Sequence, residues 1–165
     1  MSGSLFSSEI GAVPMAMDSK DITMTLQSVS GGITAPGGFF AAGVHAGIKA
    51  DGRLDLGLLV SDPPAACAAV YTRNRIQGHH ISLCRERLPG SNISAVWVNS
   101  GNANACNGRD GLEAAGSVNA EVASILKVSD SSVVNCSTGT IGRPFPGDAM
   151  KAAVPALHAA LSPTG

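Results

Sequence analysis

Short apolar segments with a strand-like pattern follow one another over the first half of the chain, separated by turn-forming residues. Ala50-Asp51-Gly52-Arg53 predicts a hairpin turn, because Asp-Gly suits the backbone angles of tight turns. Asp62-Pro63-Pro64 predicts a break, because proline lacks the N–H group that a strand ladder needs. The strands predicted in this way occupy residues 39–49, 54–61, 65–72, 80–84 and 93–100.

A helical pattern begins after Gly108-Arg109. Asp110 and Glu113 have the spacing of a capping box, with Asp110 as N-cap and Glu113 at the third helical position. A strand over residues 131–137 and a second helix over residues 150–161, kinked or interrupted by Pro155, complete the pattern. The apolar residues on one face of the first helix are Leu112, Ala115, Val118, Val122, Ile125 and Leu126.

The order of these elements is strands first, then a strand alternating with helices, without a regular βαβ repeat. We therefore predict an α+β fold in which helices pack on a layered mixed or antiparallel sheet. The 165 residues suit one domain or half of a larger fold. Residues 1–28 show no sustained periodicity and precede a turn-rich run over residues 31–38, which predicts a flexible leader over 1–28 and one folded unit over 29–165.

Charge and composition narrow the possible partners. Net charge is −1 and basic residues do not cluster, so nucleic acid is not expected as a partner. The apolar runs are far shorter than the ~20 residues of a membrane span, and the first 20 residues resemble no targeting signal, so we predict a cytoplasmic protein without a membrane partner. Only 14% of residues are charged, against ~25% in typical soluble chains, which predicts a neutral surface or one covered by a partner.

Cysteines and acidic residues give no sign of a metal or a cofactor. The four cysteines, Cys67, Cys84, Cys106 and Cys136, contain no CxxC pair and are predicted to be buried thiols rather than disulfides or metal ligands. The acidic residues are scattered, so no carboxylate pair or metal cluster follows from their spacing. We therefore expect no cofactor and no metal.

Two polar, glycine-containing segments follow predicted strands. In residues 99–108, asparagine side chains either satisfy their own backbone or form the wall of a site, and the spacing matches no phosphate-binding loop. In residues 137–142, the Thr138 hydroxyl and the Gly139 N–H are neighbouring donors that suit a developing oxyanion, although Ser-Thr-Gly is also an ordinary turn. A further hypothesis is a Cys106 nucleophile with His45, His79 or His80 as its base. The alternative is that Cys106 is a buried thiol and that His79 and His80 are a structural pair.

Several segments together resemble one family, the bifunctional ornithine acetyltransferases (glutamate N-acetyltransferases) of arginine biosynthesis, also called the ArgJ family. The resemblance covers residues 31–161 and its most specific part is Asn99-Ser100-Gly101-Asn102-Ala103-Asn104-Ala105-Cys106. The other segments that carry it are residues 31–36, 38–39, 41–49, 53–56, 71–75 and 137–142.

The resemblance implies that this chain is the N-terminal α part of such an enzyme. A threonine at the start of a β chain, freed by self-cleavage of a precursor at an Ala-Thr bond, would take the acetyl group from N-acetylornithine and pass it to glutamate. The α part would supply the oxyanion hole, which falls on the Thr138 hydroxyl and the Gly139 N–H. The implied partners are the β chain, in an α2β2 heterotetramer, and the substrates N-acetylornithine, ornithine and glutamate.

The sequence departs from the family pattern at its C-terminal end. It contains no Ala-Thr dipeptide, so the nucleophile is not in this chain, and it stops at Ser162-Pro163-Thr164-Gly165. We expect either a fragment of the α chain or a truncated product. The alternative function is a catalytically silent binding or assembly module built on the same half-fold.

Overall fold

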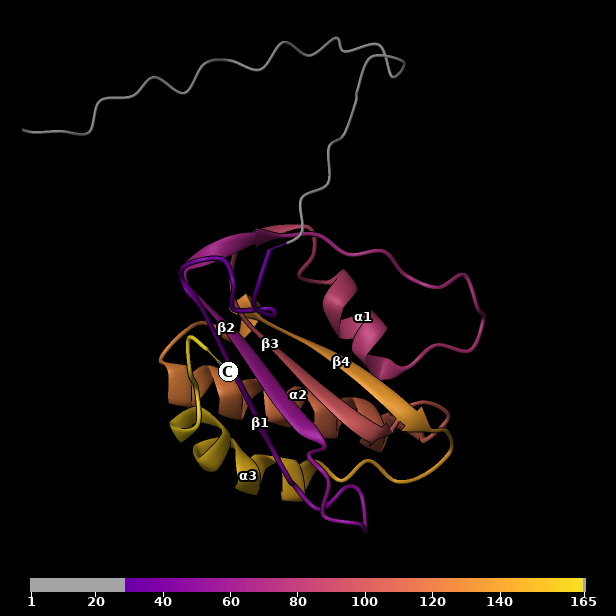
Figure 1. Cartoon of the computed structure of the whole chain (residues 1–165). Coiled ribbons are helices and arrows are strands. Elements are labelled where there is room, and N and C mark those ends of the chain that lie inside the picture. The colour runs from indigo at the N-terminus through magenta and orange to yellow at the C-terminus, as the bar shows by residue number, and fades with distance from the viewer. Residues whose placement is uncertain (1–28, 165) are drawn as a thin grey trace, which may run out of the picture.

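The computed structural model describes residues 29–164, so the predicted leader over 1–28 lies outside the described residues. Four strands form one sheet in the order β1-β2-β3-β4. β1 pairs with β2 and β2 with β3 in antiparallel fashion, whereas β3 and β4 run parallel. The strands are β1 (Phe39–Val44), β2 (Leu56–Cys67), β3 (Gly90–Asn102) and β4 (Val133–Thr140), as Figure 1 shows.

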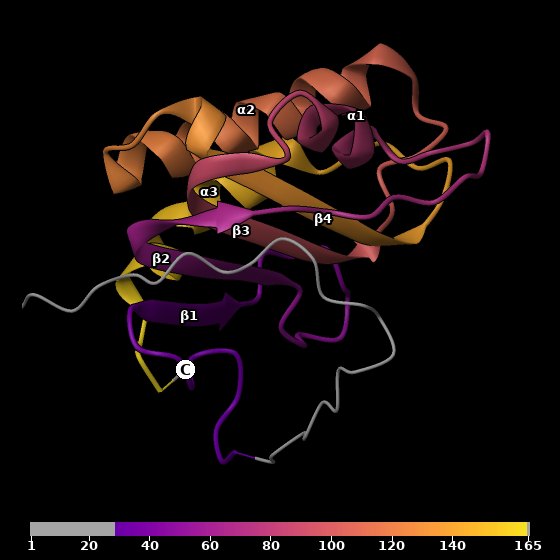
Figure 2. The same ribbon diagram turned by 90° about the horizontal axis from the view of Figure 1, so that it is seen from above.

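Two helices cover one face of this sheet, α2 (Gly108–Leu126) and α3 (Gly147–Ala159) (Figures 1 and 2). Trp97 lies fully buried between them and the strands, and its Nε1 donates to Asn119 Oδ1 of α2 at 2.6 Å. The mixed sheet with packed helices confirms the predicted α+β fold. The other buried members of this core are Leu56, Leu58, Ala95, Val118, Val122, Ala123, Val133, Met150, Val154 and Leu157.

The opposite face of the sheet carries no helix over β1, β2 and most of β3 (Figure 1). Side chains alternate along a strand, so Val98 and Cys136 point to this face, away from the core residues Trp97 and Asn135. Val98 is 41% exposed and Cys136 is also exposed. A largely neutral, partly apolar surface is therefore open at the middle of the sheet.

The segment 80–84, predicted as a strand, is helical in the structure: α1 spans His79–Arg85. Ile81 and Cys84 are both buried, a spacing of three residues that fits one helical face. Leu88, after the end of the helix, packs on the same cluster as Cys84. Just after the helix, Arg87 donates from Nη1 to the Val133 carbonyl at 2.8 Å. The strand prediction was wrong because a short apolar run does not distinguish the two-residue period of a strand from the 3.6-residue period of a helix.

β2 continues through the break predicted at Asp62-Pro63-Pro64 and ends at Cys67, so the expected strand over 65–72 is mostly absent. The predicted loss of ladder pairing at the prolines is present, because β2 and β3 have no pairs between Val60 and Ala65. The pairing of β2 with β3 shifts register between Val60 and Ala65. Prolines are tolerated at such an irregularity, where no ladder hydrogen bond is required of them. The turn predicted at Ala50-Asp51 is present between β1 and β2.

The helix ends differ from the predicted signals. α2 begins at Gly108 with Asn107 as N-cap and no side-chain cap hydrogen bond, so Asp110 and Glu113 form no capping box. Glu113 instead lies 3.2 Å from Arg109 Nε, one helical turn away. In α3, Pro155 lies within the helix and does not interrupt it; its side chain is exposed.

All four cysteines are free, but their burial differs from the prediction. Cys84 is buried and Cys67 is half-buried, whereas Cys106 and Cys136 are exposed. The prediction of buried thiols was wrong for the last two, because Cys106 lies in the loop before α2 and Cys136 is on the side of β4 that faces away from α2 and α3.

Candidate active site

The two polar segments singled out from the sequence lie side by side at the carboxyl ends of the parallel strands β3 and β4. In the parallel register Asn99 is opposite Ser137, Ser100 opposite Thr138 and Gly101 opposite Gly139. The strand predicted to end at Ser137 continues to Thr140, so Thr138 and Gly139 belong to β4 itself. The sheet therefore fixes both candidate oxyanion donors in one ladder.

Gly139 occupies a position that only glycine fits. Its φ is +135°, and a Cβ there would lie 2.3 Å from the Gly101 carbonyl carbon and 2.5 Å from the Asn102 nitrogen. The Thr140 carbonyl accepts from the Ala103 N–H at 3.0 Å and so faces β3. Because successive peptide groups of a strand point to opposite sides, the Gly139 N–H faces the outer edge of β4, where the described residues place no further strand.

Thr138 is exposed and lies on the open face of the sheet, two positions after Cys136. Ser100 is its neighbour across the parallel pair. Among residues 29–164 no partner takes up the Thr138 hydroxyl. The Thr138 hydroxyl therefore has no partner among the described residues, and the Gly139 N–H next to it is directed away from β3.

A ladder of asparagine side chains holds the backbone around these donors. Asn99 Nδ2 donates to the Asn102 carbonyl at 2.8 Å, and Asn102 Nδ2 donates to the Pro144 carbonyl at 2.9 Å. Asn102 Oδ1 accepts from the Asn104 N–H at 2.8 Å. Asn102 therefore ties the end of β3 to the turn that follows β4.

The ladder continues to the first turn of α2. Asn104 Nδ2 donates to the Gly111 carbonyl at 2.9 Å, and Asn107 Nδ2 lies 2.9 Å from Asn104 Oδ1 and 3.2 Å from the Arg143 carbonyl. Of the two interpretations open for residues 99–108, the structure supports the one in which the asparagines satisfy backbone groups. The backbone they hold, however, belongs to the candidate site.

Asp55 is a residue of this region that the sequence did not single out. Its buried carboxylate accepts from the N–H groups of Ala46 at 2.6 Å and of Ile48 and Lys49 at 2.8 Å each. The loop that it holds packs on β3, because a Cβ at Gly101 would lie 2.9 Å from Ile48 Cγ2. The sequence feature that could have indicated Asp55 is an acidic residue directly before an apolar strand.

The pKa of Asp55 reflects these donors. Burial alone would raise the pKa, but the N–H groups of Ala46, Lys49 and Ile48, with the nearby His45, outweigh burial and lower it below its usual value. His45 Nδ1 lies 3.2 Å from the Asp55 carboxylate and 3.0 Å from the Arg53 carbonyl. His45 is therefore engaged with the β1–β2 connection.

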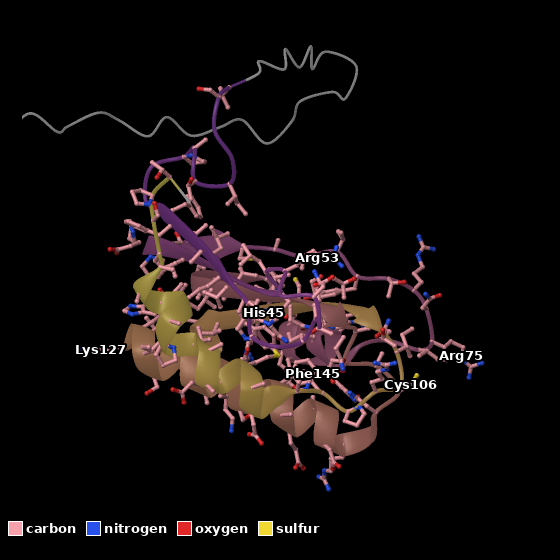
Figure 3. The ribbon with its side chains drawn as sticks, turned by 60° about the horizontal axis from the view of Figure 1, so that its bottom comes forward. His45, Arg53, Arg75, Cys106, Lys127 and Phe145 are labelled. Carbon is pink, nitrogen blue, oxygen red and sulfur yellow. The ribbon has the colours of Figure 1, made fainter. Side chains whose placement is uncertain are left out.

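The structure does not bring Cys106 together with a histidine base. Cys106 is exposed, and Figure 3 shows it far from His45. The backbone N–H of His79 donates to the Asn104 carbonyl at 2.9 Å, but within residues 29–164 no histidine nitrogen bonds the Cys106 thiol. The described residues also contain no group of three metal-ligating side chains, and none of their helices is long and apolar enough to span a membrane.

Comparison with known proteins decides the family. The model of the ArgJ family matches residues 40–164. The chain belongs to the ArgJ family. The arginine biosynthesis bifunctional proteins ArgJ of Geobacter sulfurreducens and Parasynechococcus marenigrum are 46% and 42% identical over 124 and 141 residues, which cover 75% and 84% of this chain. Those stretches are 32% and 34% of the relatives, so the chain spans about a third of their length.

Two solved ArgJ-family structures have the same fold. The arginine biosynthesis bifunctional protein argJ of Bacillus halodurans matches with a TM-score of 0.71 and 38% identity, covering 75% of this chain and 65% of that one. The ornithine acetyltransferase of Mycobacterium tuberculosis, solved in complex with ornithine, matches with a TM-score of 0.77 and 38% identity, covering 81% and 72%. The resemblance inferred from the sequence motifs is confirmed.

Proposed function

We propose that this chain is the oxyanion-bearing part of an acetyltransferase that moves an acetyl group from N-acetylornithine to glutamate. The Thr138 hydroxyl and the Gly139 N–H would bind the oxyanion that forms on the acetyl carbonyl. The nucleophile would be a threonine at the start of a β chain from the same precursor, freed by self-cleavage, in an α2β2 assembly. No cofactor enters this reaction, and we place the enzyme in the cytoplasm.

The observation that carries the proposal is that two neighbouring hydrogen-bond donors, the Thr138 hydroxyl and the Gly139 N–H, lie on a strand end that is held rigidly. Oxyanion stabilisation requires donors that are in place before the charge develops, because moving the donors into position would cost part of the free energy with which they stabilise the transition state. Gly139 is wedged against Gly101, and the asparagine ladder holds the turn after β4. The absence of a Cβ at Gly139 also lets a reacting carbonyl approach the N–H.

The proposed reaction has two balanced half-reactions. In the first, the β-chain threonine oxygen bonds to the acetyl carbon while the carbon–nitrogen bond to ornithine breaks, and the hydroxyl proton passes through the threonine's own α-amine to the departing nitrogen. In the second, the glutamate nitrogen bonds to the acetyl carbon while the carbon–oxygen bond to the threonine breaks, and a proton from the glutamate amine passes through the threonine's α-amine to the threonine oxygen. Thr138 and Gly139 would stabilise the negative oxygen in both.

Substitution at Thr138 tests the proposal in a precursor or reconstituted complex that contains the nucleophilic threonine. We expect Thr138→Ala to lower kcat about 10²- to 10³-fold with little change in KM, since one oxyanion donor is lost. Thr138→Ser should retain more activity because it keeps the hydroxyl. Thr140→Val, at an exposed threonine of the same strand, is the matched control and should leave kcat near wild type.

Wild-type kcat in a folded Thr138→Ala complex would remove Thr138 from the mechanism. If the chain with a competent β chain shows no acetyl transfer at all, the second candidate remains, a silent binding or assembly module. The exposed Val98 and Cys136 on the open sheet face support an assembly role under either candidate.

A further inference from the structure

Beside the candidate oxyanion donors, the loop of residues 46–49 contacts Gly101 of β3, and Gly101 contacts Gly139 of β4. The two glycines are directly opposite in the parallel ladder, and both have a positive φ, +114° and +135°. A Cβ at Gly139 would lie 2.7 Å from the Gly101 Cα. A Cβ at Gly101 would lie 2.9 Å from Ile48 Cγ2 and 3.4 Å from Lys49 Cγ. Gly101 therefore connects the 46–49 loop to Gly139.

The conformation of the 46–49 loop is fixed by Asp55. The Asp55 side chain is fully buried, and its carboxylate accepts from the N–H groups of three loop residues, Ala46, Ile48 and Lys49. Hydrogen bonds to an ionised acceptor are stronger than those between neutral groups, so the loop has little freedom to move. Asp55 thus holds Ile48 where its side chain packs against Gly101.

Asp55 also contacts β3 through its main chain. Its carbonyl accepts from the Ser100 N–H at 2.9 Å. Ser100 is opposite Thr138, just as Gly101 is opposite Gly139. Asp55 therefore contacts the β3 residues that pair with both candidate donors, Ser100 directly and Gly101 through the loop.

We propose that Asp55 and Ile48 are positioning residues for the candidate oxyanion hole, which hold Gly139 in place through Gly101. This inference rests on the proposed function, because it assigns a role within the same site. Glycine has more conformational freedom than any other residue, so the position of its peptide group depends on its neighbours. Within residues 29–164, β4 pairs with β3 alone, so the position of Gly139 is set from the β3 side.

The competing explanation is that Ile48 contributes to stability only. Ile48 is half-buried and packs on the main apolar core of the chain. Ile125 of α2 is the matched control, because it is the same residue type, is also half-buried and packs on the same core. A substitution at Ile125 therefore measures the effect of losing similar apolar contacts away from Gly101.

Kinetics of a precursor or reconstituted complex with the nucleophilic threonine test the positioning role. Ile48→Ala removes the methyl group that faces Gly101 and should lower kcat about 10-fold or more, since small misplacements of catalytic groups are costly. KM should stay within about 2-fold, because the loss falls on the transition state rather than on substrate binding. Ile48→Val keeps a γ-methyl group and should restore kcat to within about 3-fold of the original chain. Ile125→Ala should leave kcat near the original value.

Asp55→Asn is the second variant, because it alters the hydrogen bonds of the loop and leaves the Ile48 side chain intact. It should give the same fall in kcat at nearly constant KM. Trp97, the only tryptophan and fully buried, reports by fluorescence that each variant is folded.

Hydrogen exchange of the Ala103 amide tests the same connection without any acetyl transfer. This N–H donates to the Thr140 carbonyl at 3.0 Å and so reports on the contact between β3 and β4 beside Gly139. In the same complex, Ile48→Ala should raise its exchange rate at least about 5-fold more than Ile125→Ala does, because the opening is local. Ile48→Val should leave the rate close to that of the original chain.

The positioning role is overturned by an unchanged kcat in folded Ile48→Ala, by an equal fall in Ile125→Ala, or by no recovery in Ile48→Val. An Ala103 exchange rate that Ile48→Ala leaves unchanged overturns it as well, even in a complex that transfers no acetyl group. Failure of the proposed function is separate: wild-type kcat in Thr138→Ala removes Thr138 from the mechanism, whatever Ile48→Ala shows. A fall in Thr138→Ala without a fall in Ile48→Ala removes only the positioning role.

Discussion

At the residue scale, Gly139 and Asp55 show how single positions hold the candidate site. Gly139 combines a positive φ with contact to the neighbouring strand, so it is constrained twice. Asp55 is a buried carboxylate that takes up three N–H groups of one loop. Gly139 shapes the strand pair next to Thr138, and Asp55 holds the loop that packs on β3. Each can be tested by a single substitution.

Gly139→Ala should destabilise the fold by about 2–4 kcal/mol, because the new Cβ meets backbone atoms that cannot move aside. Gly142→Ala is the matched control: its φ is also positive, at +77°, but no atom lies within 4 Å of the new Cβ. Backbone strain alone should cost Gly142→Ala about 1 kcal/mol. Chemical denaturation of both variants measures the difference, and equal losses would contradict the crowding argument.

Asp55→Asn should lower stability by about 3 kcal/mol at neutral pH, since charge-assisted hydrogen bonds to three N–H groups are weakened. The pKa of Asp55 is lower in the folded than in the unfolded chain, so its stabilisation is present above the unfolded value of about 3.9 and is lost as pH falls through the folded value. Urea unfolding between neutral and acidic pH should therefore show a steeper acid loss for the original chain than for Asp55→Asn. Parallel curves would contradict this account.

At the element scale, the ends of β3, β4 and α2 are joined by asparagine side chains rather than by apolar packing. Asn102 is central, because it bonds both Asn104 and the turn after β4. The Gly142 N–H, which donates to the Ala105 carbonyl at 2.8 Å, reports on the same junction. The site region is therefore held by side-chain hydrogen bonds. Removing one of them should increase local opening at the turn after β4 more than in the rest of the sheet.

Asn102→Ala should raise the hydrogen-exchange rate of the Gly142 amide about 10-fold or more, because the Pro144 carbonyl and the Asn104 N–H lose their partner. Amides in the middle of α2 should change less. Asn74→Ala, at an exposed asparagine outside the ladder, is the control. Uniform acceleration at all amides would show global destabilisation instead of a local opening.

At the scale of the whole molecule, α2 and α3 cover one face of the sheet, and the opposite face is open over β1, β2 and most of β3 (Figure 1). Val98 lies on the uncovered face, and only 14% of the residues are charged. An exposed apolar side chain at the centre of a sheet suits a surface that a partner covers. In the proposed enzyme the β chain would cover it.

The chain expressed alone should self-associate or bind a hydrophobic dye, as light scattering and dye fluorescence will show. Val98→Lys should reduce both effects by placing a charge on the open face. Ile33→Lys, at a residue that is 61% exposed and outside the sheet, is the matched control and should have little effect. A dye-silent, monodisperse original chain would argue that the open face needs no partner.

The sequence by itself determined the elements with long, regular patterns and the family. The periodic apolar face predicted α2, and the alternation of strands and turns predicted a mixed sheet, because each pattern follows from burying one face of a regular element. The motif Asn99 to Cys106 indicated the family, which the comparisons confirm. The Thr138 and Gly139 assignment came from the same resemblance and stays a prediction.

Only the tertiary structure decided which of two local possibilities each ambiguous segment adopts. The run 80–84 became helix α1 because Arg87 bonds the Val133 carbonyl and Cys84 packs on Val134, partners about 50 residues away. Asp55 became an anchor only because the chain brings the loop 46–49 around it, and Gly139 proved irreplaceable only through its contact with Gly101. Such contacts depend on where distant segments meet, and local periodicity carries no information about that.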